Sequence, residues 1–311
     1  MATTTMQLER TIVLQRQAPT MVHAEKVALI YEGGGMRNAY TAAVVDRLIY
    51  NSVTFGWVGG ISAGATHTAN YLSGDRVRAR KCFVEFGADP RTGGVRSFLR
   101  GTGYFNAEYI YEAVGLPDAD LPFDWEAFHA NPTPFRIGAT RADTGETVYF
   151  GREDAPTVQD LMRRVRCSST LPGLMPVPEV GGVEYVDGAL GKSGGLPVDA
   201  AIDDGFEKFL IIRTRPRGFR RTPPRSPQLI RRMLRKRPVV ADLMLTRHER
   251  YNKACELIED LEQSGQAKVF YPENMKIANI ERNFPKLQQA FNYGLEQTQR
   301  EWDEWIQFLG N

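Results

Sequence analysis

Ser62 stands in a stretch whose residue types could support nucleophilic chemistry. Residues 60–64 read Gly-Ile-Ser-Ala-Gly and match the pattern G-x-S-x-G. In that pattern a serine occupies a tight turn between a strand and a helix, and Gly60 and Gly64 would allow the turn to close. An apolar stretch ends at Val58, and a helix can begin directly after the serine, so its N-terminal N–H groups would face an anion forming there. The pattern predicts a nucleophile; the alternative is an N-capping serine in a glycine-rich turn.

A second glycine-rich turn, from Glu32 to Asn38, could stabilise negative charge. It follows an earlier apolar stretch, so in a parallel sheet it would lie at the same edge as Ser62. Glycine has no side chain, so its backbone N–H can approach a substrate oxygen closely, and each donor to an oxyanion is worth about 10²- to 10³-fold in rate. We expect an oxyanion hole here, with Arg37 as a supporting motif residue. Its expected donors are the backbone N–H groups of Gly33, Gly34, Gly35 and Met36.

Asp187 is the candidate acid partner of Ser62. It ends a short apolar stretch and is followed by Gly188 and Ala189. Catalytic groups of open sheets gather at strand ends, so we expect Asp187 to accept the proton of the serine hydroxyl. An unperturbed aspartate, with a pKa of about 3.9, is a poor base at neutral pH, so burial near Ser62 would have to raise its basicity. The alternative is an Asx turn with a surface carboxylate.

A histidine base is the usual alternative to a carboxylate, and the chain has four histidines. The order Ser62, Asp187, His248 would suit a Ser-Asp-His triad of the α/β-hydrolase kind. In that fold the serine turn normally follows several strands of the sheet, whereas only one strand and one helix precede the strand that leads into Ser62. His248 also lies in a charged helical stretch, which favours a solvated or structural role. His67 would sit on the helix after the serine and point away from it.

Two phosphate-binding patterns fit the glycines less well. The dinucleotide pattern G-x-G-x-x-G would need a third glycine where Asn38 stands, and an acid at the end of the next strand, where Gly59 and Gly60 stand. The phosphate loop of nucleotide triphosphatases could end at residues 191–193, Gly-Lys-Ser, but its required earlier glycine is Val186. These departures favour an ester over a nucleotide at the glycine turns.

The elements expected around these residues follow an α/β pattern. Continuous apolar stretches at 27–31, 55–59 and 209–212 are typical of strands buried on both faces. A helical stretch lies between the first two, and such a strand-helix-strand unit implies parallel pairing. Residues 135–140 and 147–150 flank an Asp-Thr-Gly turn and predict a hairpin.

The chain divides into four expected regions. They are a lead-in over 1–24, a catalytic core over 25–215, a basic Pro- and Arg-rich segment over 216–240 and a mostly helical extension over 241–311. Within the core, residues 88–134 suggest a cap or lid. The last helix has one apolar face, from Leu287 to Leu309, which we expect to pack on the core.

The three motifs together resemble those of patatin-like phospholipases. The resemblance rests on the glycine turn, the serine turn and the Asp187 turn in this order and spacing, and on the Ser-rich residues 167–172. It covers residues 25–215. It is closest to compact bacterial members, whose C-terminal parts carry a basic linker and a helical Arg-His-x-x-Tyr-Asn segment, here Arg247 to Asn252.

This resemblance implies a fold, an activity and a set of site residues. The fold would be a three-layer α/β/α arrangement around a mostly parallel sheet. The activity would be hydrolysis of lipid esters, of phospholipase A or lysophospholipase type, by a dyad of Ser62 and Asp187 without cofactor or metal. The substrate would be a lipid ester or a fatty-acyl compound. One departure is Asn38, which replaces a glycine usual in the family; asparagine tolerates a left-handed backbone better than most residues. An alternative is a lipid- or partner-binding protein of this fold without turnover.

Composition and charge limit the expected compartment and partners. The chain has 311 residues, 42% of them hydrophobic, and its three cysteines form no CxxC pair, which favours a reducing, cytoplasmic compartment. The net charge is +2, yet residues 213–237 hold eleven basic residues and no acid. This stretch, Arg213 to Arg237, could form a cationic amphipathic helix that contacts an anionic membrane, or a solvated loop. We expect no nucleic-acid binding, because the overall charge is low and no recognition module is present.

Overall fold

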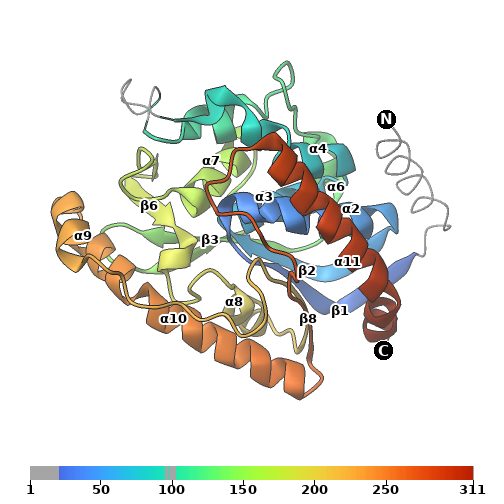
Figure 1. Ribbon diagram of the computed structural model, residues 1–311. Coiled ribbons are helices and arrows are strands. Elements are labelled where there is room, and N and C mark those ends of the chain that lie inside the picture. The colour runs from blue at the N-terminus through green and yellow to red at the C-terminus, as the bar shows by residue number, and fades with distance from the viewer. Residues whose placement is uncertain (1–20, 95–96, 98–102, 311) are drawn as a thin grey trace.

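The computed structural model describes residues 21–94, 97 and 103–310, which form an eight-stranded sheet with helices on both faces (Figure 1). The strands are β1 (Val22–Tyr31), β2 (Val53–Ile61), β3 (Phe135–Arg141), β4 (Thr147–Phe150), β5 (Glu179–Val180), β6 (Val183–Asp187), β7 (Lys208–Ile212) and β8 (Ala267–Phe270). The helices of six or more residues are α2 (Asn38–Tyr50), α3 (Ala63–Leu72), α4 (Arg76–Lys81), the π-helix η4 (Glu108–Ala113), α6 (Trp125–Ala130), α7 (Val158–Ser169), α8 (Val198–Asp203), α9 (Pro227–Met233), α10 (Pro238–Gln263) and α11 (Phe284–Gly310).

The sheet is mostly parallel, as the sequence predicts. Its strand order is β5-β6-β3-β2-β1-β7-β8, with β4 paired to β3 beside this path. The strands β1, β2, β3, β7 and β8 pair in parallel, whereas β4, β5 and β6 pair antiparallel. The opening unit β1-α2-β2 and the hairpin β3-β4 are both confirmed.

The side chains of alternate residues of β1 pack on opposite faces of the sheet. Leu29 and Tyr31 pack with α2, α3, α7 and α11, while Ala28 and Ile30 pack with α8 and α10. Figure 1 shows the first set of helices on one side of the sheet and α8 and α10 on the other. Because both faces are covered, the central strands read as continuous apolar runs. The predicted three-layer α/β/α arrangement is confirmed.

The partners of β3 explain how the far-apart Ser62 and Asp187 can meet. Residues 135–138 of β3 pair with β2, residues 139–141 pair with β6, and β4 overlaps both sets. A strand has only two edges, so β2 and β6 must lie end to end along the same edge of β3. They run in opposite directions. The C-terminal end of β2, just before Ser62, therefore faces the C-terminal end of β6, at Asp187.

The start of β1 lies earlier than the apolar run at 27–31 suggested. Val22 to Ala24 pair with Val53 to Phe55, and the register shifts between Ala24 and Ala28. The irregularity interrupts the apolar pattern, so these residues resemble a lead-in by sequence. Residues 1–20 of the expected lead-in lie outside the described residues.

About half of the basic residues in the stretch 213–237 are paired with acidic residues of the same chain. Five of its arginines form ion pairs with acidic residues, namely Arg213 with Glu32, Arg217 with Glu262, Arg220 with Glu259, Arg231 with Asp242 and Arg237 with Glu184. Only residues 227–233 are helical before α10 begins, so both the helix and the loop that the sequence allowed are present, in succession. In the part of the chain that the structure describes, no helix is long and apolar enough to cross a membrane.

The C-terminal elements are integrated with the rest of the structure. β8 pairs with β7, and α11 packs along α2. On α11, Leu287, Phe291 and Trp302 are buried, as expected for its apolar face, and Trp305 is fully buried beside Phe270.

Candidate active site

Ser62 occupies the turn between β2 and α3 in a strained backbone conformation. Its φ is 58° and its ψ is −127°, a region that non-glycine residues rarely adopt. Its N–H donates to Ser168 Oγ at 2.8 Å, and Ser168 Oγ donates in turn to the carbonyl oxygen of Gly138 at 2.6 Å. These bonds connect the serine turn to α7 and β3 and hold the strained turn in place.

Asp187 lies within hydrogen-bond distance of Ser62. The Ser62 hydroxyl donates to Asp187 Oδ2 at 2.9 Å, and the N–H of Ala189 donates to Asp187 Oδ1 at 2.8 Å. The carboxylate is 4% exposed. Burial raises the pKa of Asp187, although Arg247, these two hydrogen bonds and Arg221 oppose the rise. The carboxylate is therefore a stronger base than a solvated aspartate.

The glycine turn offers two free N–H groups rather than four. The N–H of Gly33 donates to the carbonyl oxygen of Gly195 at 3.3 Å, and the N–H of Met36 donates to that of Asn279 at 2.9 Å. The N–H groups of Gly34 and Gly35 have no acceptor among the described residues. This narrows the expectation of four oxyanion donors to two, because the other two amides are used to anchor the turn.

Side chains on both flanks hold the glycine turn by its carbonyl groups. Thr214 Oγ1 donates to the carbonyl oxygen of Gly33 at 2.9 Å, and Asn38 Nδ2 donates to that of Gly35 at 3.1 Å. Asn38 is the first residue of α2 and has a right-handed conformation. The left-handed tolerance that the sequence argument invoked for Asn38 is therefore not needed, and its side chain instead fixes the turn.

The supporting motif glycines lie where the backbone is crowded. Gly60 is in β2, and Gly188 directly follows Asp187. Gly64 is in the first turn of α3, where a Cβ atom would stand 2.3 Å from the carbonyl oxygen of Tyr31. Only glycine lets α3 approach β1 this closely.

The two histidines considered from the sequence have other partners. His248 Nδ1 lies 3.1 Å from the carbonyl oxygen of Leu245, and His248 is not among the described residues that line the cavity at Ser62. The triad alternative therefore has no support in the geometry. His67 is fully buried and hydrogen-bonds Thr41 Oγ1 at 3.0 Å; burial lowers its pKa to about 3.

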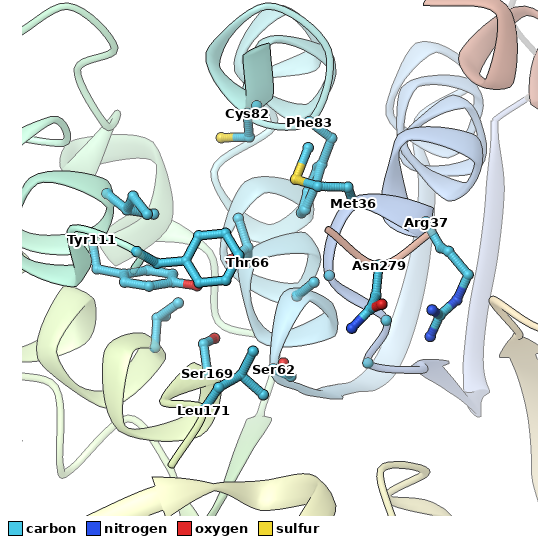
Figure 2. A pocket seen from close by; sticks show the side chains of 18 of the residues that line it. Met36, Arg37, Ser62, Thr66, Cys82, Phe83, Tyr111, Ser169, Leu171 and Asn279 are labelled. Atoms are coloured by element: carbon cyan, nitrogen blue, oxygen red, sulfur yellow. The ribbon is translucent and has the colours of Figure 1, made fainter. Parts of the chain in front are cut away.

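A cavity of about 330 Å³ opens beside Ser62. Its volume suits one small molecule or one end of a larger one. In Figure 2, Tyr111, Ser169 and Leu171 lie to one side of Ser62, and Arg37 and Asn279 lie to the other. The apolar part of its lining includes Phe83, Phe86, Ile110, Val114, Leu121, Met162, Val165, Leu171 and Met175.

Sequence reasoning missed several residues of this site. Ser168 lies in the Ser-rich stretch noted above, but nothing in the sequence gave it the role of binding the Ser62 amide. Arg215 and Arg221 line the cavity, whereas the sequence predicts for the basic stretch either a membrane contact or a solvated loop. Arg247 also lines it, one residue before the histidine that was considered. The run of arginines was the available signal.

Comparison with known proteins places this geometry in a family. The family model "Patatin-like phospholipase" matches residues 29–202, more than half of the chain, and a model described as a domain of unknown function (DUF6363) matches residues 237–310. The first match includes the glycine turn, the serine turn and Asp187.

Two individual proteins are similar over part of their length. The uncharacterized protein YjjU of Escherichia coli K12 is 29% identical over 201 residues, which are 64% of this chain and 54% of that protein. The chain thus spans about half the length of this relative. The crystal structure of VipD from Legionella pneumophila aligns with a TM-score of 0.47 at 12% identity, covering 91% of this chain and 66% of that one. From the family model, which extends over both glycine-rich turns and the acid, we conclude that the chain belongs to the patatin-like phospholipase family.

Proposed function

We propose that the protein is a serine acylhydrolase that cleaves lipid esters of the phospholipase A or lysophospholipase type. The observation that carries the proposal is the 2.9 Å hydrogen bond from the Ser62 hydroxyl to a buried carboxylate, Asp187, beside a cavity with a large apolar part. A nucleophile paired with a base of raised pKa is the arrangement that acyl transfer requires.

The reaction would proceed through an acyl-enzyme. Ser62 Oγ attacks the ester carbonyl as Asp187 accepts its proton, and the N–H groups of Gly34 and Gly35 donate to the oxyanion. The C–O bond to the alcohol then breaks, and the proton on Asp187 passes to the leaving oxygen. A water molecule, deprotonated by Asp187, attacks the acyl-enzyme and releases the fatty acid, and the proton returns to Ser62.

Release of fatty acid from a lysophospholipid by the purified protein tests this mechanism. Ser62→Ala and Asp187→Asn should each lower kcat by at least about 10³-fold, because the two residues act as one unit. The variant Ser264→Ala serves as a control, because Ser264 lies at the end of α10 and not in the cavity lining. Full activity in either dyad variant would rule out the dyad.

We also propose that α9 contacts anionic membrane surfaces. Leu229 and Met233 are 59% and 54% exposed, and Arg232 lies on the same short helix. Met233 lies against Gly173, in the loop between the cavity residues Leu171 and Met175, so this helix adjoins the cavity. Exposed apolar side chains beside cations suit the interface of an anionic bilayer.

Vesicle sedimentation tests the membrane contact. The protein should sediment with vesicles of anionic lipid more than with vesicles of neutral lipid, and the double variant Leu229→Ser, Met233→Ser should lose most of that binding. Ile202→Ser, an exposed position on α8, is the matched control and should bind normally. Equal binding to both kinds of vesicle would remove the proposal.

A further inference from the structure

Four arginines on the cavity wall are buried at their Nε atoms without a hydrogen-bond partner. Among the described residues, six arginines line the cavity. Four of them have an Nε atom that is buried and unpartnered, and none of these four forms an ion pair with a described residue. We call them the arginine cluster: Arg37, Arg215, Arg221 and Arg247.

The other two cavity arginines show what a structural role looks like here. Arg282 donates to the carbonyl oxygens of Gly93 and Asp89 and to Thr92 Oγ1. Arg78 donates to Asn70 Oδ1 and to the carbonyl oxygen of Leu121. These two guanidinium groups donate hydrogen bonds that connect segments of the chain. The guanidinium groups of the arginine cluster donate no hydrogen bond to a described residue.

Two members of the cluster, Arg215 and Arg221, are nevertheless held in position. The guanidinium of Arg215 lies 4.2 Å from the ring centroid of Phe219, and that of Arg221 lies 4.6 Å from the ring centroid of Tyr251. Asn252 binds the backbone of Arg221 on both sides, accepting from its N–H at 2.9 Å and donating to its carbonyl oxygen at 3.0 Å. Ring stacking leaves the guanidinium edges available, so these arginines are preorganised to bind something else.

The charge of the cluster is only partly compensated within the described part of the chain. Burial, together with Arg215, lowers the pKa of Arg37 to about 10, and burial with Arg221 lowers that of Arg247 to about 10, so both remain charged at neutral pH. Glu32, the nearby buried acid, is paired with Arg213 at 3.1 Å. Arg37 is buried and the other three are half-buried, so four cations partly removed from water face only Glu32 and Asp187 as buried acids among the described residues. This excess of positive charge is costly, which favours an anion supplied from outside.

The position of the cluster relative to the dyad suggests which part of a substrate carries that anion. Arg221 and Arg247 both act on the charge of Asp187, and Arg37 belongs to the glycine turn. Figure 2 shows Arg37 on the opposite side of Ser62 from Tyr111 and Leu171, where the apolar lining begins. A lipid whose ester carbonyl meets Ser62 would place its acyl chain on the apolar side and its headgroup on the arginine side.

We propose that the arginine cluster binds the phosphate of the substrate headgroup and selects glycerophospholipids whose headgroup is a negatively charged phosphomonoester. Guanidinium groups bind phosphate oxygens in pairs of parallel N–H···O bonds, and several can share one dianionic group. A choline-bearing headgroup adds a cation that the cluster would repel, and a neutral glyceride offers it no charge. The proposal rests on the proposed function, since it places the ester at Ser62.

Binding to a variant that cannot turn over separates recognition from catalysis. With Ser62→Ala, calorimetry should give a Kd for oleoyl-lysophosphatidic acid at least about tenfold lower than for oleoyl-lysophosphatidylcholine or mono-oleoylglycerol, all below their critical micelle concentrations. Inorganic phosphate should displace the lipid only at millimolar concentrations. Equal affinity for the three lipids would overturn the proposal, and displacement by micromolar phosphate would assign the site to free phosphate instead.

Matched substitutions identify the charges that matter. In the Ser62→Ala background, Arg221→Gln or Arg247→Gln should each weaken lysophosphatidic acid binding about tenfold. Either substitution should change mono-oleoylglycerol binding less than twofold. Arg225→Gln removes one charge from an exposed position of the same stretch. It should leave the binding of both lipids unchanged. Because Arg221 and Arg247 contribute separately, the proposal stays testable if one variant does not fold. Loss of binding to both lipids alike would contradict a role in charge recognition.

These results do not depend on the dyad. If the cluster binds phosphate but the unsubstituted protein releases no fatty acid, the proposed hydrolysis fails and the anion site stands. If fatty acid is released equally from the anionic, choline-bearing and neutral lipids, hydrolysis stands and headgroup selection is wrong.

Discussion

Ser62 and the glycine turn show how few backbone positions control the site. Gly35 has a φ of 55°, and a Cβ atom there would stand 2.4 Å from the carbonyl oxygen of Asn279. That carbonyl accepts the N–H of Met36, so any shift would move the free N–H groups of Gly34 and Gly35. The conformation that frees these donors is therefore one that only glycine can adopt here.

Gly35→Ala should lower kcat by about 10²-fold or more, because it displaces a proposed oxyanion donor, and should change KM little. Steady-state hydrolysis of a lysophospholipid gives both values. Gly74→Ala is the matched control: Gly74 also has a positive φ, of 67°, but a Cβ atom there meets nothing within 4 Å. It should cost about 1 kcal/mol of stability and leave kcat unchanged. Equal loss of kcat in both variants would contradict the assigned role of Gly35.

Asp187 should cost the protein stability at neutral pH. Burial raises its folded-state pKa above the unfolded value near 3.9, so the ionised carboxylate destabilises the folded state above that raised pKa. This cost disappears as pH falls below the unfolded pKa. Asp187→Asn should therefore be more stable than the unsubstituted chain in urea at pH 8, with a difference that shrinks toward pH 4. A variant that is less stable at pH 8 would show that the carboxylate is not destabilised by burial.

At the scale of elements, a buried polar network connects the ends of β1 and β7 with the middle of α10. Arg213 donates to Glu32 at 3.1 Å and to the Tyr251 hydroxyl at 3.0 Å, and Tyr251 donates to the second carboxylate oxygen of Glu32 at 2.7 Å. Burial would raise the pKa of Glu32, but Arg213, the N–H of Thr214 and Tyr251 lower it overall. The network fixes the glycine turn, which directly follows Glu32.

Arg213→Met should lower the free energy of unfolding by about 3–5 kcal/mol, because Glu32 would remain as an unpaired buried charge. Arg217→Met is the control, since Arg217 is 63% exposed and its ion pair with Glu262 is worth about 1 kcal/mol or less. Urea unfolding measures the free energy of unfolding of both single variants. The double variant Glu32→Gln, Arg213→Met should recover part of the stability that Arg213→Met loses. Similar small losses in the two single variants would contradict a network that depends on burial.

The elements that could be predicted from the sequence are those with local signals. The run at 27–31, the serine turn and the Asp-Thr-Gly hairpin each carry their pattern within a few residues. The meeting of β6 with β2 along one edge of β3 carries no such pattern, because it depends on how far β3 extends beyond β2. Arg221 could not be distinguished from Arg225 for the same reason: both belong to one charge run, and only the tertiary structure turns one toward the cavity.

At the scale of the whole molecule, the region after the basic segment is part of the same folded body. β8 extends the sheet beside β7, and α10 supplies Tyr251 and Arg247 to the neighbourhood of the site. The sequence predicted a helical extension packed on the core. It could not predict that this extension contributes to the cavity, because its contacts with the glycine turn span more than 200 residues of sequence.

Trp305 tests how strongly α11 supports the body. It is fully buried and packs edge-on against Phe270 of β8, with ring centroids 5.5 Å apart. Trp305→Ala should lower the free energy of unfolding by about 3–5 kcal/mol. Phe284→Ala, at a 44% exposed position of the same helix, should change it by about 0.5 kcal/mol or less. Equal effects in thermal unfolding would contradict the packing of α11 on the sheet.

Labelling of the intact protein by a fluorophosphonate, followed by mass spectrometry, tests the central claim most directly. The probe reacts with a serine only where the hydroxyl is activated and an oxyanion can be stabilised. We predict a single adduct at Ser62, its absence in Ser62→Ala and slow formation in Asp187→Asn. A chain that stays unlabelled while folded would contradict the claim of an activated serine and favour a lipid-binding protein of this fold.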